Sequence, residues 1–137
     1  MRTIPALPVL LLVAGAVFSG CLSSDNTFVD TLAERGTAIA PLMHQLNQSV
    51  TDRDFNASRD ACSRMLVVED TYLPRLAAIR VSGKYNTSKQ YFLTGIADEQ
   101  TGCRMMLDRP DSDLGPAMQY ITRSADDFSL GVQAWPE

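Results

Sequence analysis

Residues 113–135 read DLGPAMQYITRSADDFSLGVQAW, and this stretch carries the clearest structural signal in the chain. Its apolar side chains recur at alternating spacings of four and three residues, which places them in one stripe along an α-helix. Asp113 can cap this helix, and Pro116 falls in its first turn, where a missing N–H costs little. The apolar stripe comprises Leu114, Met118, Ile121, Ala125, Phe128, Val132 and Trp135.

Three further helices are predicted before this one. Their apolar residues recur at helical spacing, and we place them over residues 27–50, 51–82 and 87–108. No run of residues shows the sustained alternation that is typical of strands. The fold class predicted is therefore all-α, and residues 27–137 form a single domain.

Local signals set the expected ends of these helices. Thr51 and Thr87 each open a sequence that resembles a capping box, and residues 109–112 read RPDS and stop the third helix. Pro41 and Pro74 fall inside the first two helices and are expected to kink, bend or split them. Because connections this short join neighbours, we expect an antiparallel up-down four-helix bundle.

The beginning of the chain has the pattern of a secretory signal. Arg2 precedes an apolar run over residues 4–18, which is too short for the roughly 20 residues that cross a bilayer. Residues 10–21 read LLLVAGAVFSGC, so small residues come directly before Cys21.

This arrangement resembles the lipobox of prokaryotic lipoprotein precursors, although Phe18 stands where leucine is usual. The resemblance implies that residues 1–20 are a signal peptide and that Cys21 carries lipid. Residues 21–26 are then a short tether, which reaches roughly 17 Å when extended. The implied location is the extracytoplasmic face of a prokaryotic membrane. An ordinary secreted protein with a stray cysteine and an uncleaved anchor are the alternatives.

The charge of the remaining chain is mildly acidic. Without Arg2, 11 of the 12 basic side chains stand against 16 acidic ones. This balance argues against nucleic acid as a partner and against electrostatic docking on anionic lipid.

Lipidation of Cys21 would leave two of the three cysteines, Cys62 and Cys103. Outside the cytoplasm, such a pair is most simply a disulfide. In an antiparallel hairpin, facing residues have a constant sum of residue numbers. The sum for this pair centres the hairpin between Ser82 and Gly83, in the predicted turn. A disulfide between the second and third helices therefore fits the expected register.

Three sequons fall at predicted helix ends and begin at Asn47, Asn56 and Asn86. Each is an acceptor for N-glycosylation in an organism that has the machinery.

Arg35, Glu69 and Glu99 fall at similar heights on the first three helices. They are candidates for an ion-pair layer or for a polar pocket that takes a small charged ligand. Val68 and Ile96 compete with the two glutamates for the inward direction. We therefore expect the three charged side chains to lie on solvated flanks.

The sequence gives no support to catalytic or metal chemistry. A di-metal carboxylate bundle needs Glu-x-x-His motifs, whereas Tyr72 and Gly102 stand three residues after the two glutamates. His44 is the single histidine, and no hydrolase motif or glycine-rich phosphate loop is present. We predict no cofactor, no metal site and no enzyme activity.

The function expected is that of a membrane-anchored cell-envelope lipoprotein with a non-catalytic binding or structural role, in contact with another envelope protein. A small-ligand sensor or carrier with a pocket between helices is the second hypothesis, and an enzyme is the third. Trp135 is expected at the membrane-proximal end, where it either lies near the headgroups or seals the bundle.

Overall fold

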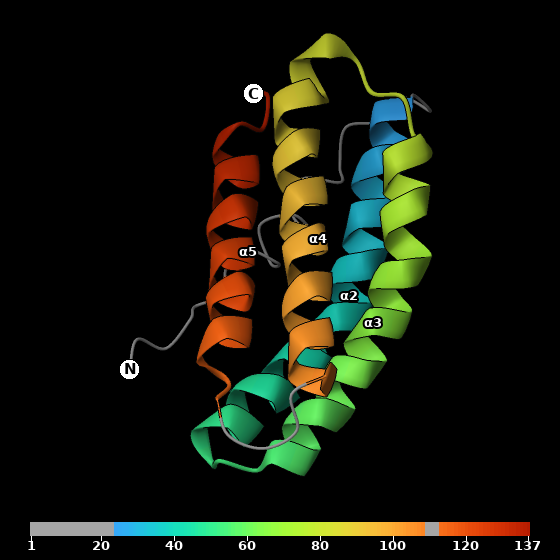
Figure 1. Ribbon diagram of the computed structural model, residues 1–137. Coiled ribbons are helices and arrows are strands. Elements are labelled where there is room, and N and C mark those ends of the chain that lie inside the picture. The colour runs from blue at the N-terminus through green and yellow to red at the C-terminus, as the bar shows by residue number, and fades with distance from the viewer. Residues whose placement is uncertain (1–23, 109–112) are drawn as a thin grey trace.

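A computed structural model describes residues 24–108 and 113–137 (Figure 1). Within these residues the chain forms α-helices and one 3₁₀ turn, without strands, so the predicted all-α class is confirmed. The helices, labelled as in Figure 1, are α2 (Ser24–Thr51), α3 (Phe55–Ala78), α4 (Asn86–Asp108) and α5 (Gly115–Gln133), and the 3₁₀ turn is η1 (Gly83–Tyr85).

Helix α3 packs between α2 and α4, and α5 packs against α4. The start of α2 contacts the segment that joins α3 to η1 through Asp25 and Ser82. The end of α2 contacts the start of α3 through Ser49 and Ser58. The start of α2, η1 and the C-terminal end of α5 lie at one end of the bundle, the upper end in Figure 1. We call it the η1 end.

The starts of α2 and α3 differ from the sequence prediction. Helix α2 begins at Ser24, so residues 24–26 of the predicted tether are helical. Thr51 does not cap α3, because its hydroxyl donates to the Asn47 carbonyl in the last turn of α2. The cap is Asp54, whose carboxylate accepts from the backbone N–H of Ala57 at 2.9 Å. The turn that joins α2 to α3 contains Arg53, whose φ of 57° lies in the left-handed region.

The predicted capping box at Thr87 is also wrong. Helix α4 begins at Asn86, directly after η1, and the Ser88 hydroxyl donates to the carbonyl of Gly131 on α5. At the start of α5, Leu114 is the N-cap, while the Asp113 carboxylate accepts from the N–H of Gly115 at 2.9 Å. The predicted stop at residues 109–112 lies outside the described residues.

Neither internal proline breaks its helix. Helix α2 continues through Pro41 and α3 through Pro74. Figure 1 shows the axis of α2 turning in its second half, as expected where a proline removes a helical hydrogen bond. Neither proline splits its helix, and α2 bends in the half that contains Pro41.

The buried core consists of two clusters. The cluster toward the end opposite η1 contains both buried cysteines and the buried methionines Met43, Met65 and Met106, with Met105 and Met118 packed at its edge. The other cluster, at the η1 end, contains the rings of Phe28 and Phe92, with Tyr72, Phe128 and Trp135 at its edge. We call these the sulfur-rich half and the aromatic half.

Helix α5 approaches α4 closely because small residues line the contact. A Cβ on Gly102 would lie 2.8 Å from the carbonyl oxygen of Ala117, which is closer than real Cβ contacts come. Of the seven predicted stripe residues on α5, Ile121 is fully buried and the others are half-buried. The fully buried neighbours are small: Ala117, Ser124 and Gly131.

Candidate functional site

A layer of charged side chains separates the two halves of the core. The Arg35 Nε donates to Glu69 Oε2 at 3.0 Å, and its Nη2 donates to the carboxylates of both Glu69 and Glu99. The three residues are 4%, 1% and 2% exposed. Helices α2, α3 and α4 each supply one member, and we call this set the ionic layer.

The expectation that these three side chains lie on solvated flanks is therefore wrong. On α3, Glu69 takes the inward direction and Val68 is left half-buried at the edge of the sulfur-rich half. On α4, Ile96 and Glu99 are three residues apart and share the inward face, so both are buried. Ile96 therefore does not displace Glu99 from the bundle interior, because the same face of α4 buries both side chains.

Helix α5 completes the surroundings of the ionic layer. The Phe128 ring lies 4.8 Å from the Arg35 guanidinium, in cation–π contact. Gly95 makes room for this ring, since a Cβ there would lie 2.6 Å from it. Ser124 is fully buried and its hydroxyl donates to the Ile121 carbonyl at 2.6 Å.

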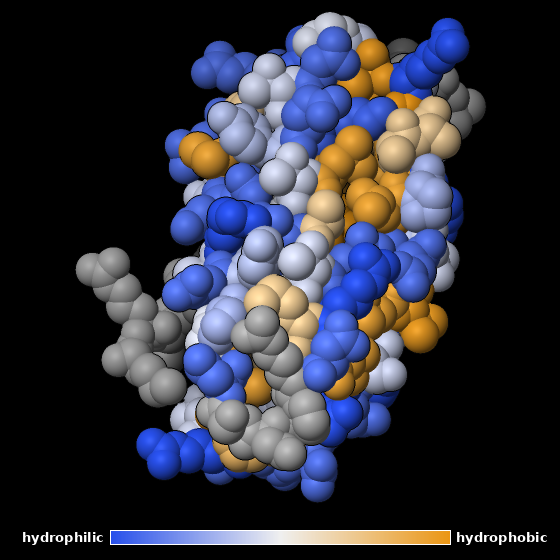
Figure 2. All heavy atoms as spheres, in the orientation of Figure 1, coloured by the Kyte–Doolittle hydropathy of each residue, from blue (hydrophilic) through white to orange (hydrophobic). Residues whose placement is uncertain are grey.

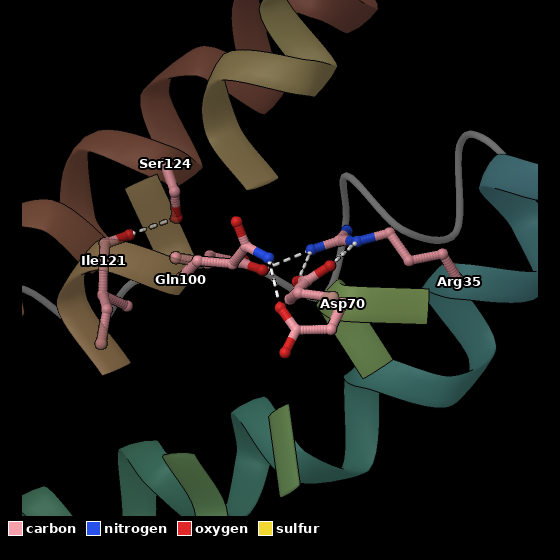
Figure 3. Close-up of polar contacts among 7 residues, drawn as sticks. Arg35, Asp70, Gln100, Ile121 and Ser124 are labelled. Carbon is pink, nitrogen blue, oxygen red and sulfur yellow. Dashed lines mark hydrogen bonds and ion pairs between the residues drawn. The ribbon is translucent and has the colours of Figure 1, made fainter. Parts of the chain in front are cut away.

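Figure 3 shows Arg35 reaching toward the neighbouring helices, with Ser124 on the far side. It also shows Gln100, whose side-chain amide donates to Asp70 at 2.8 Å and links α4 to α3 beside the layer. Sequence reasoning missed Ser124 and Phe128. Serine and phenylalanine carry no charge pattern, and their roles follow from the position of α5 alone.

The ionic layer holds two carboxyl groups and one guanidinium. Burial raises the pKa of Glu99 well above its usual range; the charge of Arg35 opposes this effect, and the neighbouring Glu69 adds to it. Burial by itself would lower the pKa of Arg35, but the two carboxylates outweigh it and raise that pKa. The Glu99 carboxyl therefore holds its proton more tightly than an exposed glutamate does, while Arg35 hydrogen-bonds to both carboxyl groups of the layer.

The polar groups of the layer satisfy one another. In residues 24–108 and 113–137, every buried side-chain nitrogen and oxygen has a hydrogen-bond partner. A ligand pocket would instead leave groups turned toward an unfilled space. The arrangement thus joins three helices through charge and hydrogen bonds.

Comparison with known proteins gives no matching family model, no matching curated protein and no matching solved structure. The site is therefore interpreted from its own geometry.

The two cysteines lie together in the sulfur-rich half. Cys62 and Cys103 are 0% and 1% exposed and approach to 2.7 Å, as the hairpin register predicts. They are free thiols in this structure, so the predicted disulfide is not present. The Cys62 Sγ also lies 3.5 Å from Met106 Sδ. A hydrogen bond with Cys62, burial and the nearby glutamates raise the pKa of Cys103, which makes it a poor nucleophile.

The other predicted positions are spread over the surface. Asn56 and Asn86 are exposed near the starts of α3 and α4, whereas Asn47 is half-buried within α2. His44 is exposed on α2. In the described part of the chain, no three His, Cys, Asp or Glu side chains are grouped as metal ligands.

The predicted signal peptide over residues 1–20 and the predicted lipidation site Cys21 lie outside the described residues. None of the helices in residues 24–108 and 113–137 has the length and apolar character that a membrane crossing requires.

Proposed function

We propose that this protein is a lipid-anchored lipoprotein of the cell envelope, held at the extracytoplasmic face of a prokaryotic membrane through Cys21. Its role is non-catalytic: it binds or supports another envelope protein through its surface. The sequence around Cys21 supports the anchor. The self-satisfied ionic layer supports the non-catalytic role.

The ionic layer is the observation that carries this proposal. Arg35, Glu69 and Glu99 are the strongest candidates for ligand-binding groups in the interior, and they already bind one another. Recognition is then left to the outer surface. Figure 2 shows apolar side chains gathered along the α3 side of the bundle, where Val67 is 68% exposed. Exposed apolar surface of this kind favours contact with a protein partner.

The proposal includes an antiparallel up-down bundle closed by a Cys62–Cys103 disulfide. The two thiols form the bond by exchange with a more oxidising protein disulfide of the envelope. Each thiol loses one proton and one electron, and the oxidising protein becomes a dithiol. Both residues are almost fully buried, so the exchange takes place before the bundle closes. A loop of about 41 residues is worth roughly 4 kcal/mol in the chain-entropy model.

The intact mass of protein extracted from the membrane tests the anchor. The expected mass begins at Cys21, includes acyl chains and lies two hydrogen masses below that of the reduced form. The Cys21→Ser variant is the control and should lack the acyl mass. A product that begins elsewhere and carries no acyl chain contradicts the anchor, and two alkylatable thiols after denaturation contradict the disulfide.

The same spectrum reports on the sequons. Added glycan mass that disappears in Asn56→Gln or Asn86→Gln identifies modification at the exposed sites. Asn47 is half-buried and offers less room for a glycan.

A further inference from the structure

We infer that the η1 end of the domain lies against the lipid headgroups and that the bundle stands outward from the bilayer. This inference rests on the proposed anchor at Cys21. The contact surface consists of Ser82, η1 and Trp135.

The first argument is the length of the tether. Because α2 begins at Ser24, only Leu22 and Ser23 separate the helix from Cys21. An extended chain spans at most about 11 Å over these three steps. The start of α2 therefore lies within that distance of the lipidated residue, closer than the sequence predicted.

A pair of hydrogen bonds fixes η1 beside this anchored helix start. The Asp25 carboxylate accepts from the backbone N–H of Ser82 at 2.7 Å and from its hydroxyl at 2.6 Å. These bonds also lower the pKa of Asp25, which keeps the carboxylate ionised. The anchor and η1 are thus held at the same end of the molecule, as the ribbon in Figure 1 also shows.

The side chains at this end suit the membrane interface. Tyr85 and Trp135 are half-buried, and their rings meet edge to face at 5.2 Å. Trp135 also stacks on Phe28 at 6.4 Å, so the ring both seals the aromatic half and borders the surface. Tyrosine and tryptophan are enriched where one side of the ring is apolar and the other is wet.

The charged side chains at the two ends of the bundle support the same orientation. Lys84 and Arg80 are exposed at the η1 end, and Lys84 Nζ lies 5.4 Å from the Tyr85 ring. The opposite end carries Asp52 and Asp54 in the turn before α3, with one arginine between them. Each lysine or arginine near anionic headgroups favours contact by about 1 kcal/mol, and the ionised Asp25 at the same end offsets part of this attraction.

Site-directed spin labels on the full lipidated protein test this orientation. One label is placed through Gly83→Cys at the η1 end, where an added side chain meets no atom within 4 Å, and the matched control through Asp52→Cys at the opposite end. Both positions are exposed, whereas Cys62 and Cys103 are shielded from the reagent. The protein is reconstituted in phosphatidylcholine vesicles with and without phosphatidylglycerol.

We expect the label at position 83 to lose accessibility to an aqueous nickel chelate relative to the label at position 52, more strongly in the anionic vesicles. As a second readout, Trp135 is the single tryptophan, and its fluorescence should be protected from iodide in vesicles. The Lys84→Glu variant should lose part of this protection.

The outcomes separate this inference from the proposed function. If the protein is acylated and floats with vesicles but the two labels are equally accessible, the orientation is wrong and the anchor stands. If the protein is neither acylated nor bound to vesicles, the anchor fails and the orientation fails with it. Equal accessibility is also expected in Cys21→Ser, which provides the reference for unanchored protein.

Discussion

The two halves of the core are built from different kinds of side chain. The sulfur-rich half contains both buried cysteines and all five methionines of the described residues, whereas the aromatic half contains the clustered rings of Phe28, Phe92, Phe128 and Trp135. Methionine is unbranched and adapts to irregular gaps. Aromatic rings favour particular relative orientations. We therefore expect the aromatic half to define its packing strictly and the sulfur-rich half to tolerate replacement.

The ionic layer lies between the halves and adds a different kind of constraint. Removing one partner of a buried ion pair leaves an uncompensated charge, whereas apolar packing admits several arrangements. Arg35 bonds to α3 and α4 at one level, so a slip of either helix along α2 breaks charged hydrogen bonds. The layer is thus suited to fix the register of three helices.

The largest expected effect comes from removing the cation between the halves. At neutral pH, Arg35→Met should lower the free energy of unfolding by about 3–5 kcal/mol, because two buried carboxyl groups lose their partner. The loss should shrink as the pH falls, because a protonated carboxyl group needs no cation beside it. Urea unfolding measures both quantities.

The control for this variant is Arg75→Met. Its ion pair with Glu34 has side chains that are 48% and 55% exposed, so a loss below about 1 kcal/mol is expected. Adding Glu69→Leu and Glu99→Leu to Arg35→Met should restore most of the stability. A single Arg35→Met variant as stable as the wild type would contradict a buried charged layer.

The second prediction compares the two halves with one replacement residue. Phe92 contacts the rings of Phe28, Phe128 and Trp135 at centroid distances of 6.0–6.5 Å. Each ring pair contributes about 0.5–1.5 kcal/mol beyond burial, so Phe92→Leu should cost about 2–3 kcal/mol. Met65→Leu, fully buried in the other half, should cost less than about 1.5 kcal/mol. Equal losses in thermal or urea unfolding would remove the distinction between the halves.

The third prediction tests whether the sulfur-rich half also tolerates an added methyl group where the backbones of α4 and α5 meet. A methyl group on Gly102 would lie 2.8 Å from both the Ala117 carbonyl oxygen and Ile121, so Gly102→Ala should cost about 1–3 kcal/mol. Gly83 in η1 has no atom within 4 Å of the same position. Gly83→Ala is the control, and a gain of up to about 1 kcal/mol is expected there. A neutral Gly102→Ala would mean that α4 and α5 separate more easily than their contact indicates.

The fourth prediction concerns the proton in the ionic layer. The folded protein holds the proton of Glu99 more tightly than the unfolded chain does, because burial raises the pKa of Glu99 above its ordinary value of 4.5. The corresponding stabilisation is complete below that value and is lost as the pH rises toward the raised pKa. Its contribution to the slope is at most about 1.4 kcal/mol per pH unit.

The Glu99→Gln variant isolates this contribution, because glutamine remains neutral at every pH. Asp25 and Asp127 also have shifted pKa values, so the comparison uses the difference between wild type and variant. As the pH rises above 4.5, the wild type should lose stability relative to the Glu99→Gln variant. Parallel pH profiles would show that Glu99 is ionised in the folded protein or does not titrate there.

Much of this fold follows from local patterns in the chain. The spacing of apolar residues predicts the four described helices and their order, and residue numbers place Cys62 next to Cys103 and the three charged residues at one height. Helix starts were less predictable. The Thr51 hydroxyl bonds back to Asn47 in the last turn of α2 instead of capping α3. In the predicted capping sequence at Thr87, the Ser88 hydroxyl bonds to Gly131 on α5, which local sequence does not reveal.

The sequence by itself determined periodicity, register and the types of side chain at each level, because these depend on spacing along one helix. The tertiary structure alone decided that Arg35, Glu69 and Glu99 face inward, that Ser124 and Phe128 surround them, and that the sulfur atoms and the rings separate into two clusters. The direction of a side chain at the edge of an apolar stripe depends on a few degrees of helix rotation. That rotation is set by contacts such as the one at Gly102, which join residues from two helices.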